Sequence, residues 1–223
     1  MMTKTKEEGY KLLNYLGVAK EVQILFSSII HEEPSGKLIF FYRDNTDEMV
    51  HEEYFTLRSL KPAVRGMAIC SPSRKESVMD IYVSDSSINL IAFCHFHFKR
   101  LSFQHAAFFS TGVKPERGLF LHYWKEYNMG KIHLLFGNSL LGRILDCKIA
   151  HWLRGEDYSF YLQGSQIISS APGEETIALA REGFSMRSYF RRRGGRNPVA
   201  THKPSLKFID NYINLLTHKT IQS

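Results

Sequence analysis

The chain has 223 residues, of which 43% are hydrophobic and 13% aromatic, a composition typical of a folded protein and not of a disordered one. Lys and Arg outnumber Asp and Glu by 29 to 22, and the resulting net charge of +7 favours polyanionic partners without requiring one. No apolar run approaches the ~20 residues of a membrane helix, and residues 1–10 hold no apolar signal core, so we expect a cytoplasmic protein with no membrane partner.

Residues 1–75 are predicted to form a subdomain of helices and a β-hairpin. Apolar residues at helical spacing predict one or two helices over residues 5–30, with a break at Gly17. Residues 37–43 and 49–57 are strongly β-forming, and a polar turn at 44–47 separates them, which indicates a hairpin. The passage from Pro62 to Ser73 is rich in turn residues and ends this region.

Residues 76–163 alternate between strand and helix patterns. Strands are predicted at 80–84, 105–109, 132–136 and 158–162, with helices at 88–98, 115–127 and 140–153 between them. Strands that alternate with helices of this length imply right-handed crossovers and a parallel sheet. The expected fold class is therefore α/β, with a mainly parallel four-stranded sheet flanked by helices.

Residues 164–223 show a looser pattern. A helix is predicted over 174–187, an exposed basic loop over 191–198, and an amphipathic helix over 204–217. We expect this segment to pack on the α/β domain.

Two strand–turn–helix motifs carry a resemblance to a known family. The segment 81–93, IYVSDSSINLIAF, resembles the first motif of Toprim domains, the metal-binding module of primases and topoisomerases. In that motif a strand ends in a catalytic Glu and an Asp opens the helix, and Asp85 and Asn89 stand at these two positions. The resemblance implies a Toprim-like fold. The region before it is similar to the small domain of primase-like and mobilization proteins of bacterial mobile elements.

The second motif departs from the family where its chemistry lies. The segment 134–143, LLFGNSLLGR, is similar to the Asp-x-Asp motif with its following Gly-Arg, but Gly137 and Ser139 stand at the acidic positions. Mg²⁺ prefers anionic oxygen ligands, and of the vestigial Toprim positions only Asp85 offers a carboxylate. We therefore expect no metal site, no cofactor and no catalysis. The alternative is a metal-dependent nuclease or primase-type enzyme in which Glu174, Glu175 or Asp210 replaces the missing acids.

The turns at Asp85 and at Asn138 and Ser139 can also be interpreted without a metal site. Asp85 is placed to cap the helix that follows it. Asn138 and Ser139 precede a helix whose N-terminus attracts anions, so together with Arg143 they are candidate phosphate ligands. An ordinary turn and cap, with Arg143 paired to Asp146 or to another surface acid, is the other interpretation.

Cysteine and histidine offer little chemistry. Cys70, Cys94 and Cys147 form no Cys-x-x-Cys pair, which favours reduced thiols over disulfides or a zinc ribbon. Cys94 and His97 are spaced to share one helix face, but no second pair at zinc spacing exists, so a packed aromatic-rich helix is the better interpretation. No Gly-x-Ser-x-Gly signature supports a hydrolase.

The segment 185–197, SMRSYFRRRGGRN, is the strongest functional signal. Arginine binds phosphate with paired donors, and an aromatic ring such as that of Tyr189 offers a base a stacking face. The candidate phosphate-binding arginines here are Arg187, Arg191, Arg192, Arg193 and Arg196. A solvated loop or a docking surface for an acidic protein are the alternatives.

These patterns support three hypotheses of function. The first is a non-catalytic Toprim-like protein of a primase or mobilization lineage that binds nucleic acid, DNA in particular, with a replication or mobilization protein as a further partner. The second is the metal-dependent enzyme described above. The third is a protein-interaction module.

Overall fold

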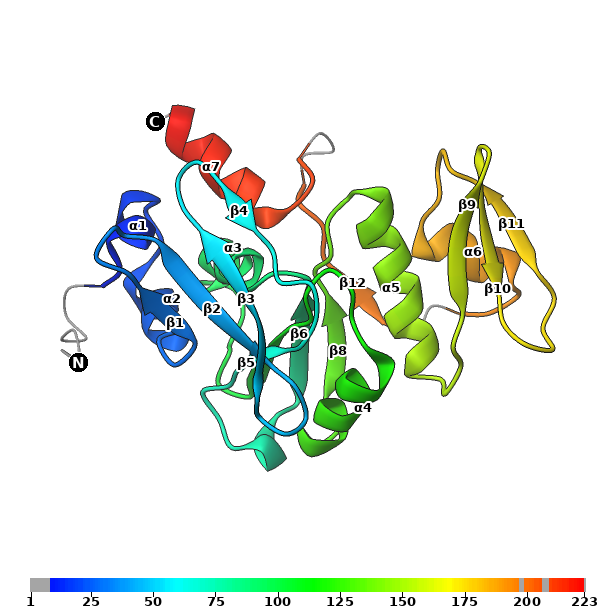
Figure 1. Cartoon of the computed structure of the whole chain (residues 1–223), viewed down its shortest axis with the longest axis horizontal. Coiled ribbons are helices and arrows are strands. Elements are labelled where there is room, and N and C mark those ends of the chain that lie inside the picture. The colour runs from blue at the N-terminus through cyan, green and yellow to red at the C-terminus, as the bar shows by residue number, and fades with distance from the viewer. Residues whose placement is uncertain (1–8, 197–198, 206–208, 223) are drawn as a thin grey trace.

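The computed structural model describes residues 9–196, 199–205 and 209–222. Its centre is a five-stranded sheet in the order β12-β8-β6-β7-β5 (Figure 1). The strands are β5 (Ala68–Cys70), β6 (Asp80–Ser84), β7 (Ala106–Ser110), β8 (Lys131–Leu134) and β12 (Ala200–Thr201). Strands β12, β8, β6 and β7 run parallel, and β5 pairs antiparallel with β7. The α/β class is confirmed, with a mixed sheet.

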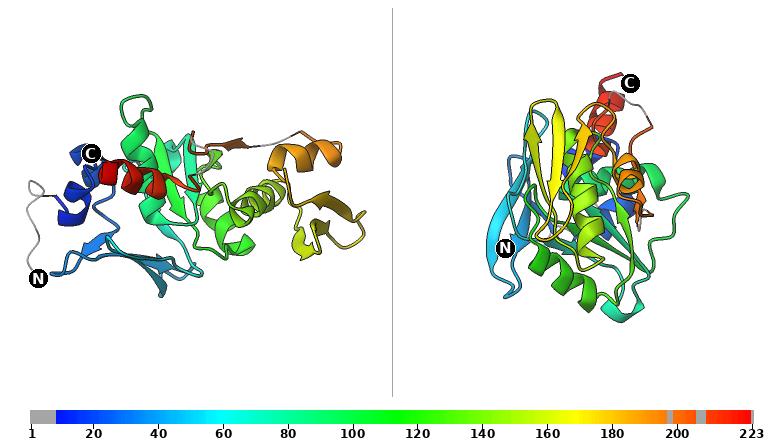
Figure 2. Two further views of the ribbon diagram at one scale, coloured as in Figure 1. Left: turned by 90° about the horizontal axis from the view of Figure 1, so that it is seen from above. Right: turned by 90° about the vertical axis from the view of Figure 1, so that its right-hand side faces the viewer.

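Helices cover both faces of this sheet (Figure 2). The crossover helices are α3 (Ser87–His97), α4 (Arg117–Glu126) and α5 (Leu140–Trp152), close to their predicted ranges. Successive side chains of β6 point to opposite faces of the sheet. Ile81 and Val83 pack in the core with α4 and α5, whereas Tyr82 packs in the core with α3. The carboxyl ends of the parallel strands therefore meet at one edge, as in other open α/β sheets.

The N-terminal region forms a second, antiparallel sheet. After α1 (Lys11–Tyr15) and α2 (Lys20–Leu25), the strands β1 (Ile30–Glu32), β2 (Leu38–Arg43), β3 (Met49–Phe55) and β4 (Leu60–Lys61) pair in chain order. The predicted hairpin is confirmed as β2–β3. The turn-rich passage that follows contains β5 and leads to a short 3₁₀ helix (Lys75–Ser77), so the central sheet takes one strand from before residue 75.

A buried carboxylate joins this N-terminal sheet to α3. Glu53 of β3 is fully buried, and its oxygens accept hydrogen bonds from the Tyr42 hydroxyl at 2.5 Å, the Ser86 hydroxyl at 2.8 Å, and the backbone N–H groups of Ser87 at 2.8 Å and Ile88 at 3.1 Å. These N–H groups lack partners within the helix, so Glu53 caps α3 from another sheet.

Three predictions for the C-terminal region are wrong. Residues 158–162 do not extend the parallel sheet, because β9 (Ser159–Gln163) turns at Gly164 and pairs antiparallel with β10 (Gln166–Ser170) in a separate sheet. The predicted helix over 174–187 is instead β11 (Ile177–Ala180), whose alternating half-buried and exposed residues suit a strand, followed by α6 (Met186–Arg192). The basic loop begins later than predicted, because Arg191 and Arg192 form the last turn of α6.

The closing helix α7 (Tyr212–Gln222) starts eight residues after the predicted Pro204 and packs on α3 (Figure 1). Part of its predicted range, residues 206–208, lies outside the described residues. No helix in the described ranges combines the length and the apolarity needed to cross a membrane.

Candidate functional site

The turns after β6 and β8, which hold Asp85 and Asn138, lie side by side at the carboxyl ends of two neighbouring parallel strands. Val83 pairs with Leu134, and the Leu135 N–H donates to the Val83 carbonyl at 2.7 Å. The buried Asn89 amide bridges the two strand ends, since its Nδ2 donates to Ser84 Oγ at 2.9 Å and to the Leu135 carbonyl at 3.0 Å. Asn89 therefore holds this edge together.

Asp85 does not cap α3, so the capping interpretation is wrong. The N-cap residue is Ser86, and Glu53 occupies the position in front of the first turn. The Asp85 carboxylate instead accepts a hydrogen bond from Ser84 Oγ at 3.1 Å. Burial raises its pKa, and the negative charge of Asp210 raises it further, while the Ser84 bond and the positive Lys203 lower it.

Asp210 fills the space beside Gly137, where the resemblance places an acid. A Cβ atom on Gly137 would lie 2.7 Å from Asp210 Oδ1, so no side chain fits there without a shift. Asp210 is fixed to this turn because its carboxylate accepts the Ser139 N–H and its carbonyl accepts the Asn138 N–H at 2.7 Å. Ser139 is the N-cap of α5, with its Oγ accepting from the Gly142 N–H at 3.1 Å. The carboxylate thus reaches this turn from a distant segment.

Lys203 places an ammonium group among the oxygens of the same edge. Its Nζ donates to the carbonyls of Phe136 and Gly137, the latter at 3.0 Å, and lies 2.7 Å from Asp146 Oδ2. An ammonium has three N–H donors, so these three acceptors saturate it. A divalent cation does not fit these oxygens while Lys203 holds them.

Asp146 is the buried partner of this lysine, not of Arg143. Its side chain is 2% exposed, and burial raises its pKa to about 6, whereas Lys203 acts in the opposite direction. Arg143 instead donates from Nε to the Asn138 carbonyl and from Nη1 to the Phe184 carbonyl, both at 2.8 Å. The sequence hypothesis of an Arg143–Asp146 pair is wrong.

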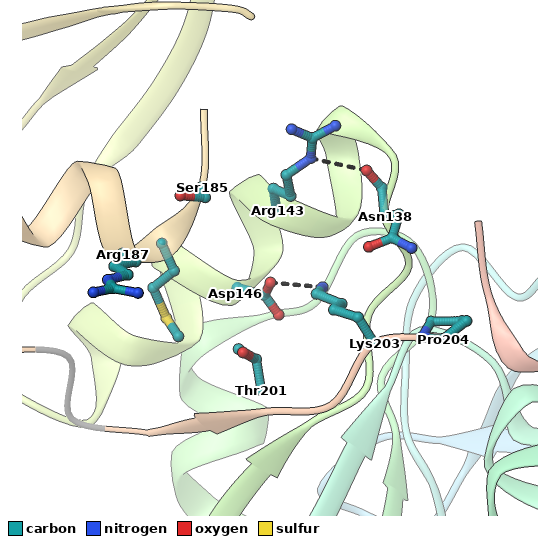
Figure 3. Close-up of a pocket in the computed structure, with 9 residues that line it drawn as sticks. Asn138, Arg143, Asp146, Ser185, Arg187, Thr201, Lys203 and Pro204 are labelled. Atoms are coloured by element: carbon teal, nitrogen blue, oxygen red, sulfur yellow. Dashed lines mark hydrogen bonds and ion pairs between the residues drawn. The ribbon is translucent and has the colours of Figure 1, made fainter. Parts of the chain in front are cut away.

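A pocket of about 470 Å³ opens beside Lys203, between α5, α6 and the segment after β12 (Figure 3). It brings together three predicted phosphate ligands, Asn138, Arg143 and Arg187, although Arg187 comes from a different helix. Within the described residues, no hydrogen bond or ion pair engages the exposed Arg187 guanidinium. The full lining is Asn138, Arg143, Asp146, Ser185, Met186, Arg187, Thr201, Lys203 and Pro204.

Two of the candidate nucleic-acid ligands in the arginine-rich segment, Tyr189 and Arg193, are internal. The Tyr189 ring is fully buried, with its hydroxyl 2.9 Å from His151 Nε2 and 2.7 Å from Ser169 Oγ, so it is not available to stack a base. The guanidinium of Arg193 lies 4.1 Å from the Tyr158 ring centre and 3.6 Å from a Glu174 oxygen, and its side chain is 16% exposed. Arg193 therefore supports the fold of this region.

The other arginines of the segment remain accessible. Arg187, Arg191, Arg192 and Arg196 are exposed. Of the acids that were candidates to complete a metal site, Asp210 reaches the sheet edge, whereas Glu174 pairs with Arg193. Glu175 is exposed in the chain before β11.

Neither Lys203 nor its buried ion pair with Asp146 was predicted from the sequence. Lys203 reaches the Gly137 carbonyl across 66 residues of chain, and it lies two residues after the short strand β12, where the sequence has no periodic pattern. One feature of the sequence does indicate that Asp146 is buried. It is a charged residue between Leu145 and Cys147, on the buried side of α5.

No known protein family and no curated protein matches the chain in sequence. Among solved structures, the primase fragment of the bacteriophage T7 primase-helicase protein is similar over 67% of this chain and 64% of that fragment, with 15% identity and a TM-score of 0.39. The chain thus spans less than two thirds of that fragment. A structure of the T7 lagging-strand DNA polymerase with primase domains is similar over 60% of this chain and 70% of the other, with 14% identity and a TM-score of 0.36. At these values the likeness assigns no function.

Proposed function

We propose that the chain is a non-catalytic, Toprim-like protein that binds nucleic acid, DNA in particular, through phosphate contacts at the pocket beside Lys203. The observation that carries the proposal is the convergence of Arg143 and Arg187 on this pocket from two helices. Arginine offers paired N–H donors in a geometry that matches phosphate oxygens. Within the part of the chain that the structure describes, the bonds of Arg143 use Nε and Nη1 and leave Nη2 available, and the guanidinium of Arg187 has no hydrogen-bond or ion-pair partner.

The outer face of α6 extends this basic surface. Arg187 and Arg191 are four residues apart and share one side of the helix, and Arg192 lies next to them. Their positive charge faces solvent because Met186, Tyr189 and Phe190 take the buried side. A nucleic-acid backbone at the pocket would meet these arginines as well.

The arrangement at the strand ends supports the non-catalytic part of the proposal. Gly137 and Ser139 offer no carboxylate, and the Lys203 ammonium already holds the Phe136 and Gly137 carbonyls and Asp146 Oδ2. The lineage that we propose, primase-like and mobilization proteins of bacterial mobile elements with a replication or mobilization partner, rests on the two strand–turn–helix motifs and on the likeness of the region before them to the small domain of such proteins.

The test is a DNA-binding titration by fluorescence anisotropy with labelled single-stranded and double-stranded oligonucleotides. A hydrogen bond to a charged group is worth roughly 1.5–3 kcal/mol, so Arg187→Glu is expected to weaken binding by about 10-fold or more. Arg181→Glu is the matched control, because Arg181 is exposed, lies outside the pocket lining and gives the same change in net charge. Equal losses in the two variants, or no binding by the wild type at low salt, would contradict the proposal.

Asp210 favours a second candidate function, the metal-dependent phosphoryl-transfer enzyme. Its carboxylate lies beside Gly137, at the turn where Toprim domains have an acidic residue and this sequence has none, and its charge acts on Asp85. Under this alternative, nuclease or primer-synthesis activity requires Mg²⁺ or Mn²⁺ and disappears in Asp210→Asn. If neither DNA binding nor metal-dependent activity is found, the protein-interaction module remains.

A further inference from the structure

The ammonium of Lys203 sits in a cage of oxygen atoms at the carboxyl end of β8. Two backbone carbonyls, those of Phe136 and Gly137, and one carboxylate oxygen of Asp146 surround it. Backbone carbonyls and carboxylates are the ligands that hard divalent cations take in proteins. The cage is therefore chemically suited to a cation, and the chain supplies that cation itself.

Two further carboxylates, those of Asp85 and Asp210, add negative charge near the cage. Asp85 and Asp210 are close enough that each negative charge affects this site, since Asp210 raises the pKa of Asp85 and Asp85 raises that of Asp146. Lys203 acts on both Asp85 and Asp146 in the opposite direction. Lys203 is thus the positive group shared by Asp85 and Asp146, and Arg143 adds a second positive charge near Asp146.

A second observation indicates that the cage is incomplete. Asp146 Oδ1 is buried and, among the described residues, has no hydrogen-bond partner. Buried carboxylate oxygens are normally satisfied by a donor or a cation, because an unpaired one loses its hydration without compensation. Lys203 engages only the other oxygen, Oδ2. A divalent metal ion, which has a higher charge and more coordination positions than an ammonium, would bind both carboxylate oxygens of Asp146.

We propose that Lys203 is a tethered cation that fills a latent site for a divalent metal ion such as Mg²⁺ or Mn²⁺. The site keeps its electrostatic balance without taking up metal, because the lysine is covalently present at a high local concentration. The inference does not depend on nucleic-acid binding. Its rival is an ordinary buried ion pair, in which the oxygens around Lys203 have no capacity for metal once the lysine is removed.

Removal of the lysine separates the two accounts. Lys203→Ala and Lys203→Met take away the ammonium, and Met keeps most of the aliphatic volume of the side chain. We expect both variants to bind a single Mn²⁺ in the micromolar range by calorimetry and by electron paramagnetic resonance. Mn²⁺ should raise their melting temperatures, since a ligand that binds only the folded state stabilises it. Adding Asp146→Asn should abolish the Mn²⁺ binding.

The control is Lys131→Ala, because Lys131 is an exposed lysine at the opposite end of the same strand. Neither this variant nor the wild type is expected to take up Mn²⁺ at the cage. Wild-type binding with the affinity of the Lys203 variants would overturn the inference, as would folded Lys203 variants that bind no Mn²⁺. If both Lys203 variants fail to fold whether or not Mn²⁺ is present during refolding, the lysine is an ordinary ion-pair partner and the inference is wrong.

Discussion

Substitution of Glu53 by alanine is expected to destabilise the whole chain, because this side chain joins the N-terminal sheet to the helix that begins beside Asp85. Alanine removes both acceptor oxygens, so the buried Ile88 N–H and the buried Ser86 hydroxyl lose their acceptor, whereas the Ser87 N–H keeps the Tyr42 hydroxyl at 3.2 Å. Each unsatisfied buried donor costs about 1–3 kcal/mol, so the two together cost about 2–6 kcal/mol. The hydroxyl of Tyr42 retains the nearby Ser110 hydroxyl as a partner and adds little.

Part of this loss is offset. Burial of the Glu53 carboxylate itself costs free energy, as its raised pKa indicates, and alanine removes that cost. We therefore expect the lower part of the range, about 2–4 kcal/mol. For a chain of this size each kcal/mol shifts the melting temperature by about 2–4 °C, so the predicted decrease is about 4–16 °C.

The assay is thermal unfolding followed by circular dichroism. Glu48→Ala is the matched control, since Glu48 lies exposed beside β3 and its loss should stay within about 0.5 kcal/mol. A Glu53→Ala protein that melts within about 1 °C of the wild type would refute the view that this carboxylate joins the sheet to α3.

Three further predictions concern the C-terminal region and the sheet. Tyr189→Phe removes two buried hydroxyl contacts and should cost roughly 1–3 kcal/mol in unfolding experiments while leaving DNA affinity unchanged; weaker DNA binding with normal stability would contradict its internal role. Arg193→Ala should lower the melting temperature, whereas substitution of its exposed neighbour, Arg192→Ala, should lower only DNA affinity. An Arg193→Ala protein with weaker DNA binding and an unchanged melting temperature would contradict the structural role of Arg193. Burial and neighbouring positive charges lower the pKa of His202 to about 4, so the folded state binds this proton more weakly than the unfolded state. Stability should therefore be lost as the pH falls from about 6.5 through 4, and urea titrations should show a flatter pH dependence for His202→Gln.

The sheet edge followed from the sequence because its elements carry strong local patterns. Residues 80–84 and 131–134 are short apolar strands, and each precedes a helix with clear apolar spacing. Parallel neighbours then place the Asp85 and Asn138 turns together without further information. What completes the site could not be predicted in this way. Lys203 lies in an irregular segment just after the two-residue strand β12, and Asp210 is held by a backbone hydrogen bond to the turn at Asn138.

The errors in the C-terminal region have a different origin. The alternation of strands with helices predicts that residues 158–162 continue the parallel sheet, yet Tyr161 and Leu162 are about half exposed in the small sheet. The start and the buried face of α6 can be recognised in the sequence. Ser185 and Ser188 form a capping box, and Met186, Tyr189 and Phe190 lie at helical spacing. That spacing assigns the aromatic rings to the core and the arginines to solvent.

The most direct test of the central claim is the salt dependence of DNA binding by a variant without the arginines of α6. Each phosphate contact contributes roughly 0.7 to 0.9 to the slope of log affinity against log salt. If Arg187, Arg191 and Arg192 all contact phosphates, their combined replacement by alanine should flatten the slope by about 2–3 units. A control variant that replaces the exposed Arg58, Lys114 and Lys125 changes the net charge equally and should keep nearly the wild-type slope. Equal slopes in all three proteins would contradict a phosphate-binding surface at the pocket and α6.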